Sequence, residues 1–256
     1  MSRMQRAALS LALPLTVLVV WQAWGMLVNN PRTPLPTKVA VASVRLVRSG
    51  DLPVGIATSV GRVFAGFAIA AALGVPLGLA MGAFRAVERN VDPLVESFRP
   101  IAAIAILPLA ILWLGTGTPA AVAIVAYAAF FPIVINTLAG ARRVNPTLLR
   151  AAATMGLSRF TTLRTVVVPA TLPAMAVGLR IGMGVAWTAI IAAELAVGAK
   201  AGGGGTGGVG QMMFIFYAYS IELNRIVVCM IAVGIVALLL DRLLRLVMRL
   251  LMPWTR

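Results

Sequence analysis

The sequence predicts an all-α integral membrane protein with about six transmembrane helices. Of its 256 residues, 61% are apolar and 11% are charged, whereas an ordinary soluble domain has roughly 45–50% apolar and about 25% charged residues. The mean hydropathy is +0.98, and there are enough apolar residues for about six segments of about 20 residues, the length that crosses a bilayer as a helix. This composition excludes a typical cytosolic enzyme.

The composition also excludes several kinds of chemistry. The chain has no histidine and one cysteine, Cys229, so a His-based triad, a His-ligated metal site, a thiolate cluster and an internal disulfide are excluded. We therefore expect no catalytic residue, no metal and no cofactor bound by this chain. The 22 Lys and Arg residues against 7 Asp and Glu are expected for a membrane protein, because basic cytoplasmic loops fix its orientation.

The first half of the chain predicts three spans. Residues 8–28 form the first, with no evident signal-peptide cleavage site after it, and residues 37–48 of the external segment that follows predict a short interfacial helix. The second span, 54–84, carries small residues at four-residue spacing, a pattern that favours close helix packing in lipid. These residues are Gly66, Ala70, Gly74, Gly78 and Gly82.

The remaining spans follow in order. After a charged turn, Asp92 and Pro93 predict the start of the third span, 94–114, which Pro100 and Pro108 should kink. A fourth span ends near Gly140, a fifth covers 174–197, and a sixth covers 222–241 after the glycine-rich loop 201–210.

Charge asymmetry predicts the orientation. With the N-terminus inside, thirteen basic residues fall in cytoplasmic segments and five in external segments. Because cytoplasmic loops retain Lys and Arg, we expect a multi-pass protein with its N- and C-termini cytoplasmic.

The polar stretch 141–173 predicts two short helices in a cytoplasmic loop. Asn145-Pro146 marks the start of the first helix, Gly156 can adopt the left-handed conformation that stops it, Ser158 can cap the second, and Pro169 should end it. Such an amphipathic helix is suited to a partner's groove. The residues on one face of the first helix are Leu148, Leu149, Ala151, Ala152 and Met155.

At this stretch the chain resembles a known family. Arg150 to Gly156, followed by nine residues and then Val166 to Pro169, is similar to the EAA loop of ABC importer permeases, whose pattern is EAA, three residues, G, nine residues, I-x-L-P. The chain departs from it at Arg150, where the motif has Glu, and at Val166 and Val168, where the motif has Ile and Leu. Further matches point to the nitrate/sulfonate/taurine branch and extend the resemblance over about 55–245; they are Asp92-Pro93 through Arg99-Pro100, Leu107-Pro108-Leu109, Trp113-Leu114-Gly115, Pro169 to Arg180, and Ala192-Ala193-Glu194.

The resemblance implies a type I ABC importer permease with MetI-like architecture, its single transmembrane domain covering 1–256. It implies a pore subunit in a bacterial inner membrane that pairs with a second permease copy or a sister permease. Two cytoplasmic ATPase subunits would bind ATP and Mg, and an external binding protein would deliver substrate. The branch suggests a small oxyanion such as taurine, another alkanesulfonate or nitrate, with bicarbonate, aromatic carboxylates or vitamin precursors as alternatives.

The resemblance also implies that the loop 141–173 couples transport to the ATPase. Its candidate coupling residues are Leu148, Leu149, Arg150, Ala151, Ala152, Met155, Gly156 and Pro169.

The fifth span predicts one packing face and one functional face. Gly178, Gly182 and Ala186 recur at four-residue spacing and form the packing face. Arg180, Trp187 and Glu194, at seven-residue spacing, form a stripe on the opposite side, which should face protein or the translocation path because charges facing lipid are costly. Alternatively, Glu194 pairs with Arg62 in a purely structural role. The translocation-path candidates are Arg62, Arg99, Arg180, Trp187 and Glu194.

The sequence disfavours three other functions: a nucleotide site, a DNA-binding motif and an intramembrane enzyme. The glycine-rich loop contains G-x-G-x-x-G, yet no strand precedes it and no Lys-Ser/Thr follows, which disfavours a nucleotide site. The two-helix loop could be mistaken for a DNA-binding motif, but the spans on both sides would hold DNA against the bilayer, so no nucleic-acid partner is expected. An intramembrane enzyme centred on Glu194 would have no second acidic residue or histidine nearby.

Overall fold

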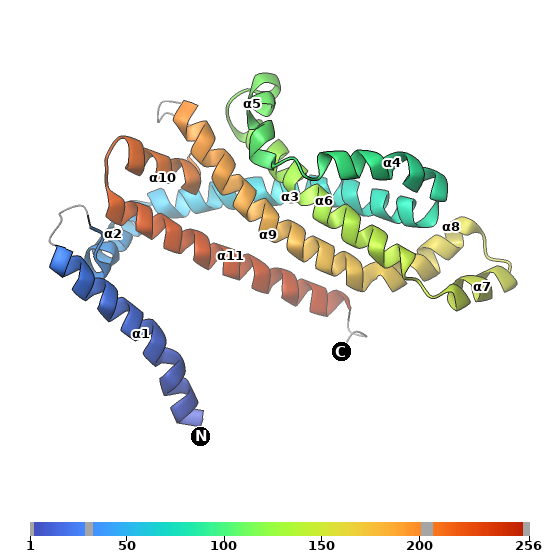
Figure 1. The fold of residues 1–256 in the computed structure, drawn as a ribbon, viewed down its shortest axis with the longest axis horizontal. Helices are drawn as coiled ribbons and strands as arrows, with labels where there is room; N and C mark the ends of the chain where they lie inside the picture. The colour runs from blue at the N-terminus through green and yellow to red at the C-terminus, as the bar shows by residue number, and fades with distance from the viewer. Residues whose placement is uncertain (1–2, 29–32, 201–206, 253–256) are drawn as a thin grey trace.

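The computed structural model describes residues 3–28, 33–200 and 207–252, and within these ranges the elements are helical (Figure 1). In chain order they are α1 (Arg3–Val28), α2 (Pro36–Arg48), α3 (Asp51–Ala83), α4 (Arg85–Phe98), α5 (Ala103–Leu114), α6 (Thr118–Arg142), α7 (Pro146–Thr154), α8 (Arg159–Thr162), the π-helical segment η1 (Leu163–Val167), α9 (Val168–Lys200), α10 (Val209–Ala218) and α11 (Leu223–Leu251).

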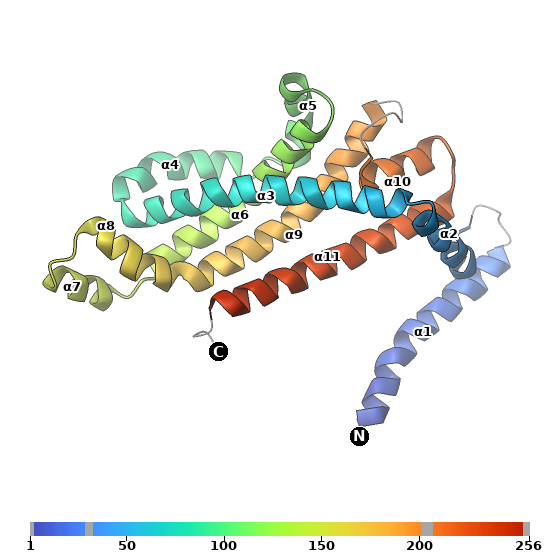
Figure 2. The same ribbon diagram turned by 180° about the vertical axis from the view of Figure 1, so that it is seen from behind.

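Four long helices, α3, α6, α9 and α11, form the body of the molecule (Figures 1 and 2). The short helices α7 and α8 lie at one end of this body, which we call the α7 end, and α2 and α10 lie at the other, the α10 end. The predicted interfacial helix 37–48 is α2, which begins at Pro36 because proline fits the first turn of a helix. Most of the glycine-rich loop, residues 201–206, lies outside the described residues.

The described helices account for four or five of the six predicted spans. Spans of sufficient length and apolarity occur in α3, α6, the continuous run from α8 to α9, and α11, and the bent pair α4–α5 makes a fifth if it is counted as one crossing. The apolar part of α1, Ala12–Val28, is shorter. The first predicted span, 8–28, therefore stays a prediction.

Small residues bring α3 and α6 into contact, as the glycine stripe predicts. A Cβ atom added at Gly66 would lie 2.7 Å from the Val122 carbonyl oxygen, and one at Gly78 would lie 2.7 Å from the Val134 carbonyl oxygen. The backbones therefore approach more closely than any larger side chain allows. On α9, Gly178 likewise contacts α6, so the predicted packing face of the fifth span also packs.

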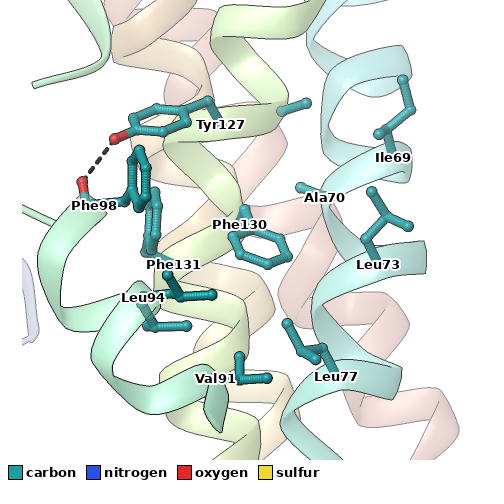
Figure 3. A pocket seen from close by; sticks show the side chains of 12 residues that line it. Ile69, Ala70, Leu73, Leu77, Val91, Leu94, Phe98, Tyr127, Phe130 and Phe131 are labelled. Atoms are coloured by element: carbon teal, nitrogen blue, oxygen red, sulfur yellow. Dashed lines mark hydrogen bonds between the residues drawn. The ribbon is translucent and has the colours of Figure 1, made fainter. Parts of the chain in front are cut away.

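The predicted start of the third span at Asp92-Pro93 is wrong. Helix α4 begins earlier, at Arg85, and Pro93 lies inside it. The interruption falls at Pro100, one of the two predicted kinks, where α4 and α5 meet at 96°. Pro108, the other predicted kink, lies inside α5 without interrupting it. Helices α3, α4 and α6 line an apolar pocket of about 360 Å³, and the Tyr127 hydroxyl donates to the Phe98 carbonyl oxygen at 2.7 Å. Figure 3 shows the side chains that line this pocket.

The expected helix end at Pro169 is also wrong. The chain continues from Arg159 through η1 into α9 without a break. In η1 the Val168 amide donates to the Leu163 carbonyl, five residues back. The missing N–H of Pro169 therefore falls where the hydrogen-bond pattern changes from π to α, a place where a helix can accommodate proline.

Candidate functional site

The loop between α6 and α9 has the predicted helix, glycine, helix geometry. The Asn145 side chain caps α7 by accepting the Thr147 amide at 2.9 Å. Gly156 has φ +71°, and the amides of Gly156 and Leu157 donate back to the Ala153 and Ala152 carbonyls at 3.0 and 3.1 Å. These two bonds form a Schellman motif, which requires a residue that tolerates the left-handed conformation.

Ser158 starts the second helix of the loop. Its hydroxyl accepts the Thr161 amide at 3.2 Å, as the predicted cap requires. The base of the loop is fixed to the bundle by a small apolar cluster in which Val144 and Val167 are buried. The loop is therefore a defined structure that projects from the α7 end.

Most apolar side chains of α7 and of the turn that follows are exposed. Ala152 is buried, whereas Leu148, Leu149 and Met155 are exposed, and Phe160 of α8 adds a further exposed ring. Arg150 is also exposed. Exposed apolar groups clustered on a projecting loop are typical of an interaction surface.

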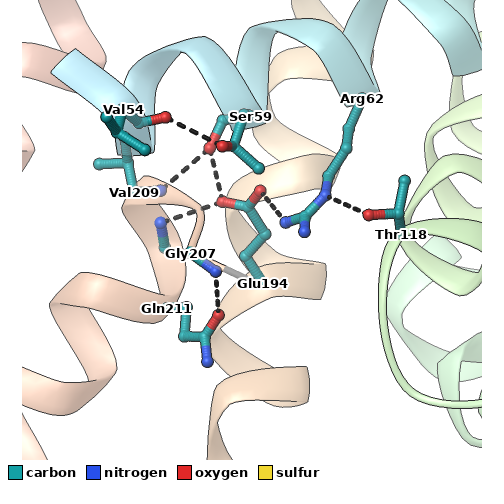
Figure 4. A network of polar contacts seen from close by, with 10 residues as sticks. Val54, Ser59, Arg62, Thr118, Glu194, Gly207, Val209 and Gln211 are labelled. Atoms are coloured by element: carbon teal, nitrogen blue, oxygen red, sulfur yellow. Dashed lines mark hydrogen bonds and ion pairs between the residues drawn. The ribbon is translucent and has the colours of Figure 1, made fainter. Parts of the chain in front are cut away.

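At the α10 end, Arg62 of α3 and Glu194 of α9 form a buried ion pair (Figure 4). The Arg62 Nη1 and Glu194 Oε1 atoms are 2.8 Å apart, and the two side chains are 6% and 2% exposed. The Arg62 Nε atom also donates to the Thr118 hydroxyl at 3.2 Å, which ties α6 to the pair. The pairing proposed from sequence as the structural alternative is therefore the observed contact.

The first turn of α10 completes this cluster. The Ser59 hydroxyl donates to Glu194 Oε2 at 2.7 Å and accepts the Val209 amide at 3.0 Å, and the Gly210 amide donates to Glu194 Oε2 at 3.1 Å. Amides at a helix N-terminus stabilise a carboxylate because their partial charge is positive. A Cβ atom at Gly208 would overlap the Glu194 carboxylate, so this glycine permits the close approach of α10.

The other two members of the fifth-span stripe contact α11. The Trp187 indole nitrogen donates to the Val233 carbonyl at 3.1 Å, and Arg180 Nε lies 2.6 Å from Asp241 Oδ1. Trp187 is buried, whereas Arg180 is half exposed. The stripe therefore faces neighbouring helices of the same chain.

Arg99 lies apart from the other translocation-path candidates. It follows the last residue of α4 and lines a cavity of about 400 Å³ together with Tyr127, Asn136 and residues of α9. The structure therefore brings Arg62 and Glu194 together and leaves Arg99 in a separate place.

The family model for the binding-protein-dependent transport system inner membrane component matches residues 74–256. The chain belongs to this family. It is the permease, or membrane-spanning, subunit of an ABC importer, a multi-pass integral membrane protein whose ATPase is a separate subunit. Permeases of this kind act with ATPase and binding-protein partners.

Several named permeases are similar to this one over most of its length. A putative ABC transporter permease of Methanocaldococcus jannaschii is 37% identical over 93% of this chain and 88% of the relative. The putative aliphatic sulfonates transport permease of Bacillus subtilis is 32% identical over 95% and 86%. The taurine transport system permease of Escherichia coli is 36% identical over 78% and 70%.

The permease fold matches a solved transporter. An inward-facing structure of the MetNI methionine ABC transporter aligns with a TM-score of 0.58 over 78% of this chain and 97% of that chain, at 22% identity. The expected MetI-like architecture is therefore confirmed. An intramembrane enzyme is not supported, because the carboxylate on which it would depend is paired with arginine inside a permease.

Sequence reasoning missed two hydrogen-bond partners of the Glu194 carboxylate, the Ser59 hydroxyl and the Gly210 amide. Ser59 and the first turn of α10 reach it from 135 and 16 residues away. The sequence signal for this contact was the pair of glycines, 208 and 210, that flank a single valine. The structure gives the reason for the second glycine, because a Cβ atom at Gly210 would lie 2.7 Å from the Ile191 carbonyl oxygen.

Proposed function

We propose that this permease conducts a small oxyanion, with taurine, another alkanesulfonate or nitrate as the substrate class. Support comes from relatives at 32–36% identity whose names specify aliphatic sulfonates and taurine. Bicarbonate, aromatic carboxylates and vitamin precursors are the alternatives that an experiment must separate from these anions.

In this proposal two copies of the permease form the pore and two ATPase subunits bind ATP and Mg beneath it. The observation that carries it is the exposed apolar face of the α7–α8 loop, formed by Leu148, Leu149, Met155 and Phe160. An amphipathic helix with such a face fits a hydrophobic groove. An ATPase groove is the partner we assign to it, with the Schellman turn at Gly156 fixing the angle between the two helices.

The proposal places both chain termini in the cytoplasm of a bacterium, with the α7 end inside and the α10 end outside the inner membrane. Arg142, Arg143, Arg150 and Arg159 belong to the α7 end, and basic residues are retained on the cytoplasmic side. The external binding protein then delivers substrate at the α10 end.

The test is reconstitution of the permease with the ATPase and the binding protein of its transporter. ATP-dependent uptake into proteoliposomes is measured for labelled taurine, ethanesulfonate, nitrate and bicarbonate in parallel, and native mass spectrometry gives the subunit ratio. We expect saturable uptake of a sulfonate or nitrate and a ratio of two permeases to two ATPases. Uptake of bicarbonate alone, or a second permease species in the complex, would contradict the corresponding part of the proposal.

A further inference from the structure

Arg99 lies about halfway along the bundle. The residue packed beside it, Tyr127, donates to the Phe98 carbonyl oxygen at 2.7 Å, and Tyr127 is nine residues from the start of α6 and fifteen from its end. At about 1.5 Å per residue, these distances are about 14 and 22 Å. The hydrocarbon core is about 30 Å thick, so Arg99 lies at membrane depth.

The backbone is broken at the same place. The carbonyl oxygen of Phe98 makes no regular α-helical bond to an amide four residues ahead, because the helix ends before Pro100. It accepts the Ile101 amide at 3.1 Å and the Tyr127 hydroxyl instead. Helix α5 then begins at Ala103, 96° away from α4. Irregular backbone at membrane depth occurs only where it is buried in protein or lines a water-filled cavity.

A cavity of about 400 Å³ adjoins this break. Arg99, Tyr127 and Asn136 are its polar lining residues, and Ala103 brings the first turn of α5 to it. The positive end of a helix favours an anion, as in other transporters whose spans are discontinuous. Charge, helix terminus and cavity therefore coincide.

The Arg99 guanidinium forms a loose ion pair with Glu96, one turn earlier on α4. The Arg99 Nη1 and Glu96 Oε1 atoms are 3.9 Å apart, too far for a hydrogen bond, and the Arg99 side chain is 55% exposed, so its N–H groups can still reach a ligand. A half-exposed cation at membrane depth is costly if it faces lipid, so such residues face a bundle interior or a water-filled path.

We propose that Arg99 is the cation of an anion-binding site halfway along the translocation path. The ligand class is a small oxyanion, a sulfonate or nitrate, because a planar guanidinium matches the oxygens of such groups with paired hydrogen bonds. The first turn of α5 adds its positive end to the site. This inference rests on the proposed function, since it assigns the anion a station inside the permease.

Thiol modification at the cavity tests the proposal with a sulfonate probe. Asn136→Cys is made in a Cys229→Ala background, and nanodiscs of zwitterionic lipid are treated with the sulfonatoethyl and the trimethylammonioethyl methanethiosulfonates. We expect both reagents to react and Arg99→Gln to lower the anion-to-cation rate ratio about tenfold, the effect of one unit charge a few ångströms away in a partly hydrated cavity. Ethanesulfonate or nitrate should slow the reaction only when Arg99 is present.

Controls separate this site from a general charge effect. Arg89→Gln removes the same charge from an exposed position ten residues earlier on α4 and should leave the ratio unchanged. Val185→Cys, on the α9 side of the cavity, provides a second reporter if Asn136→Cys does not fold. Absence of reaction at both positions, or equal ratios with and without Arg99, would overturn the proposal.

The modification assay needs neither ATPase nor binding protein, so it fails or succeeds separately from the proposed function. If the rate ratio depends on Arg99 but no oxyanion is transported, the site stands and the substrate assignment falls. If an oxyanion is transported and the anion-to-cation rate ratio is the same with and without Arg99, the inference is wrong. A ratio that changes only when anionic lipid is added would indicate an effect of membrane surface charge and would also overturn the proposal.

Discussion

The substitution Glu194→Gln tests whether the buried ion pair stabilises the permease. It removes the counter-charge of Arg62, whose side chain is 6% exposed, while glutamine can still accept the bonds from Ser59 and the Gly210 amide. Removal of one partner from a buried pair costs about 3–5 kcal/mol, because the remaining charge is left uncompensated. We expect the free energy of unfolding to fall by about that amount.

The double variant Arg62→Gln/Glu194→Gln should recover most of this loss, because a neutral polar pair avoids an uncompensated buried charge. Cys229 is fully buried and can report unfolding through a thiol-reactive dye in detergent. As a matched control, Glu222→Gln removes the carboxylate of an exposed pair with Arg225, for which we expect less than about 1 kcal/mol.

Two results would refute this reasoning. Unchanged unfolding of Glu194→Gln together with lost transport would place the carboxylate in the translocation path and reject the structural role. A double variant as unstable as the sum of the single variants would show that Arg62 and Glu194 act independently.

Three further predictions concern the loop, the packing and the orientation. Gly156→Val should reduce ATPase association, because a β-branched residue at φ +71° costs about 1–2 kcal/mol. Gly61→Val, in open space on α3, is the control. Unchanged transport-coupled ATP hydrolysis in Gly156→Val would contradict a coupling role for the loop. Gly78→Ala should lower the free energy of unfolding by about 1–3 kcal/mol through overpacking against α6, measured by the same dye assay, and Gly61→Ala should not. With Cys229 replaced by Ala, Ser220→Cys should react with an impermeant reagent on intact cells, whereas Thr161→Cys should react only after permeabilisation; the reverse would overturn the orientation.

Hydropathy and small-residue spacing predicted where the long apolar helices lie and which face of α3 packs, because both depend on local sequence. The helices α9 and α11 extend beyond the predicted spans 174–197 and 222–241. The stripe from Gly66 to Gly82 indicated packing against another helix, and the structure identifies that helix as α6. The angle at Pro100 was not predictable in this way. At the bend the Tyr127 hydroxyl, 29 residues away in the sequence, donates to the Phe98 carbonyl, and local sequence does not reveal this contact.

The α7–α8 loop and the Glu194 cluster also differ in how far their geometry depends on local sequence. The cap at Asn145 and the turn at Gly156 are local, so their geometry follows from residues within one or two turns. The Glu194 cluster joins α3, α6, α9 and α10, and only the Arg62 partner could be suggested from charge. Pro169 was misjudged because a π-helical segment places proline where no regular i→i−4 bond is lost.

The position of α9 suggests how the two ends of the permease communicate. Helix α9 continues directly from η1 at the base of the α7–α8 loop and extends over 33 residues, about 50 Å, with Glu194 about 39 Å from its start. A continuous helix transmits a rigid-body tilt, and Trp187 and Arg180 attach this one to α11 along its length. Movement of the loop on an ATPase would therefore tilt α9 and α11 together. That tilt would pull on the Arg62–Glu194 pair, the contact that joins α9 to α3 at the α10 end. A variant that weakens this pair should therefore lower the transport obtained per ATP hydrolysed, even where Gly156 and the loop are intact.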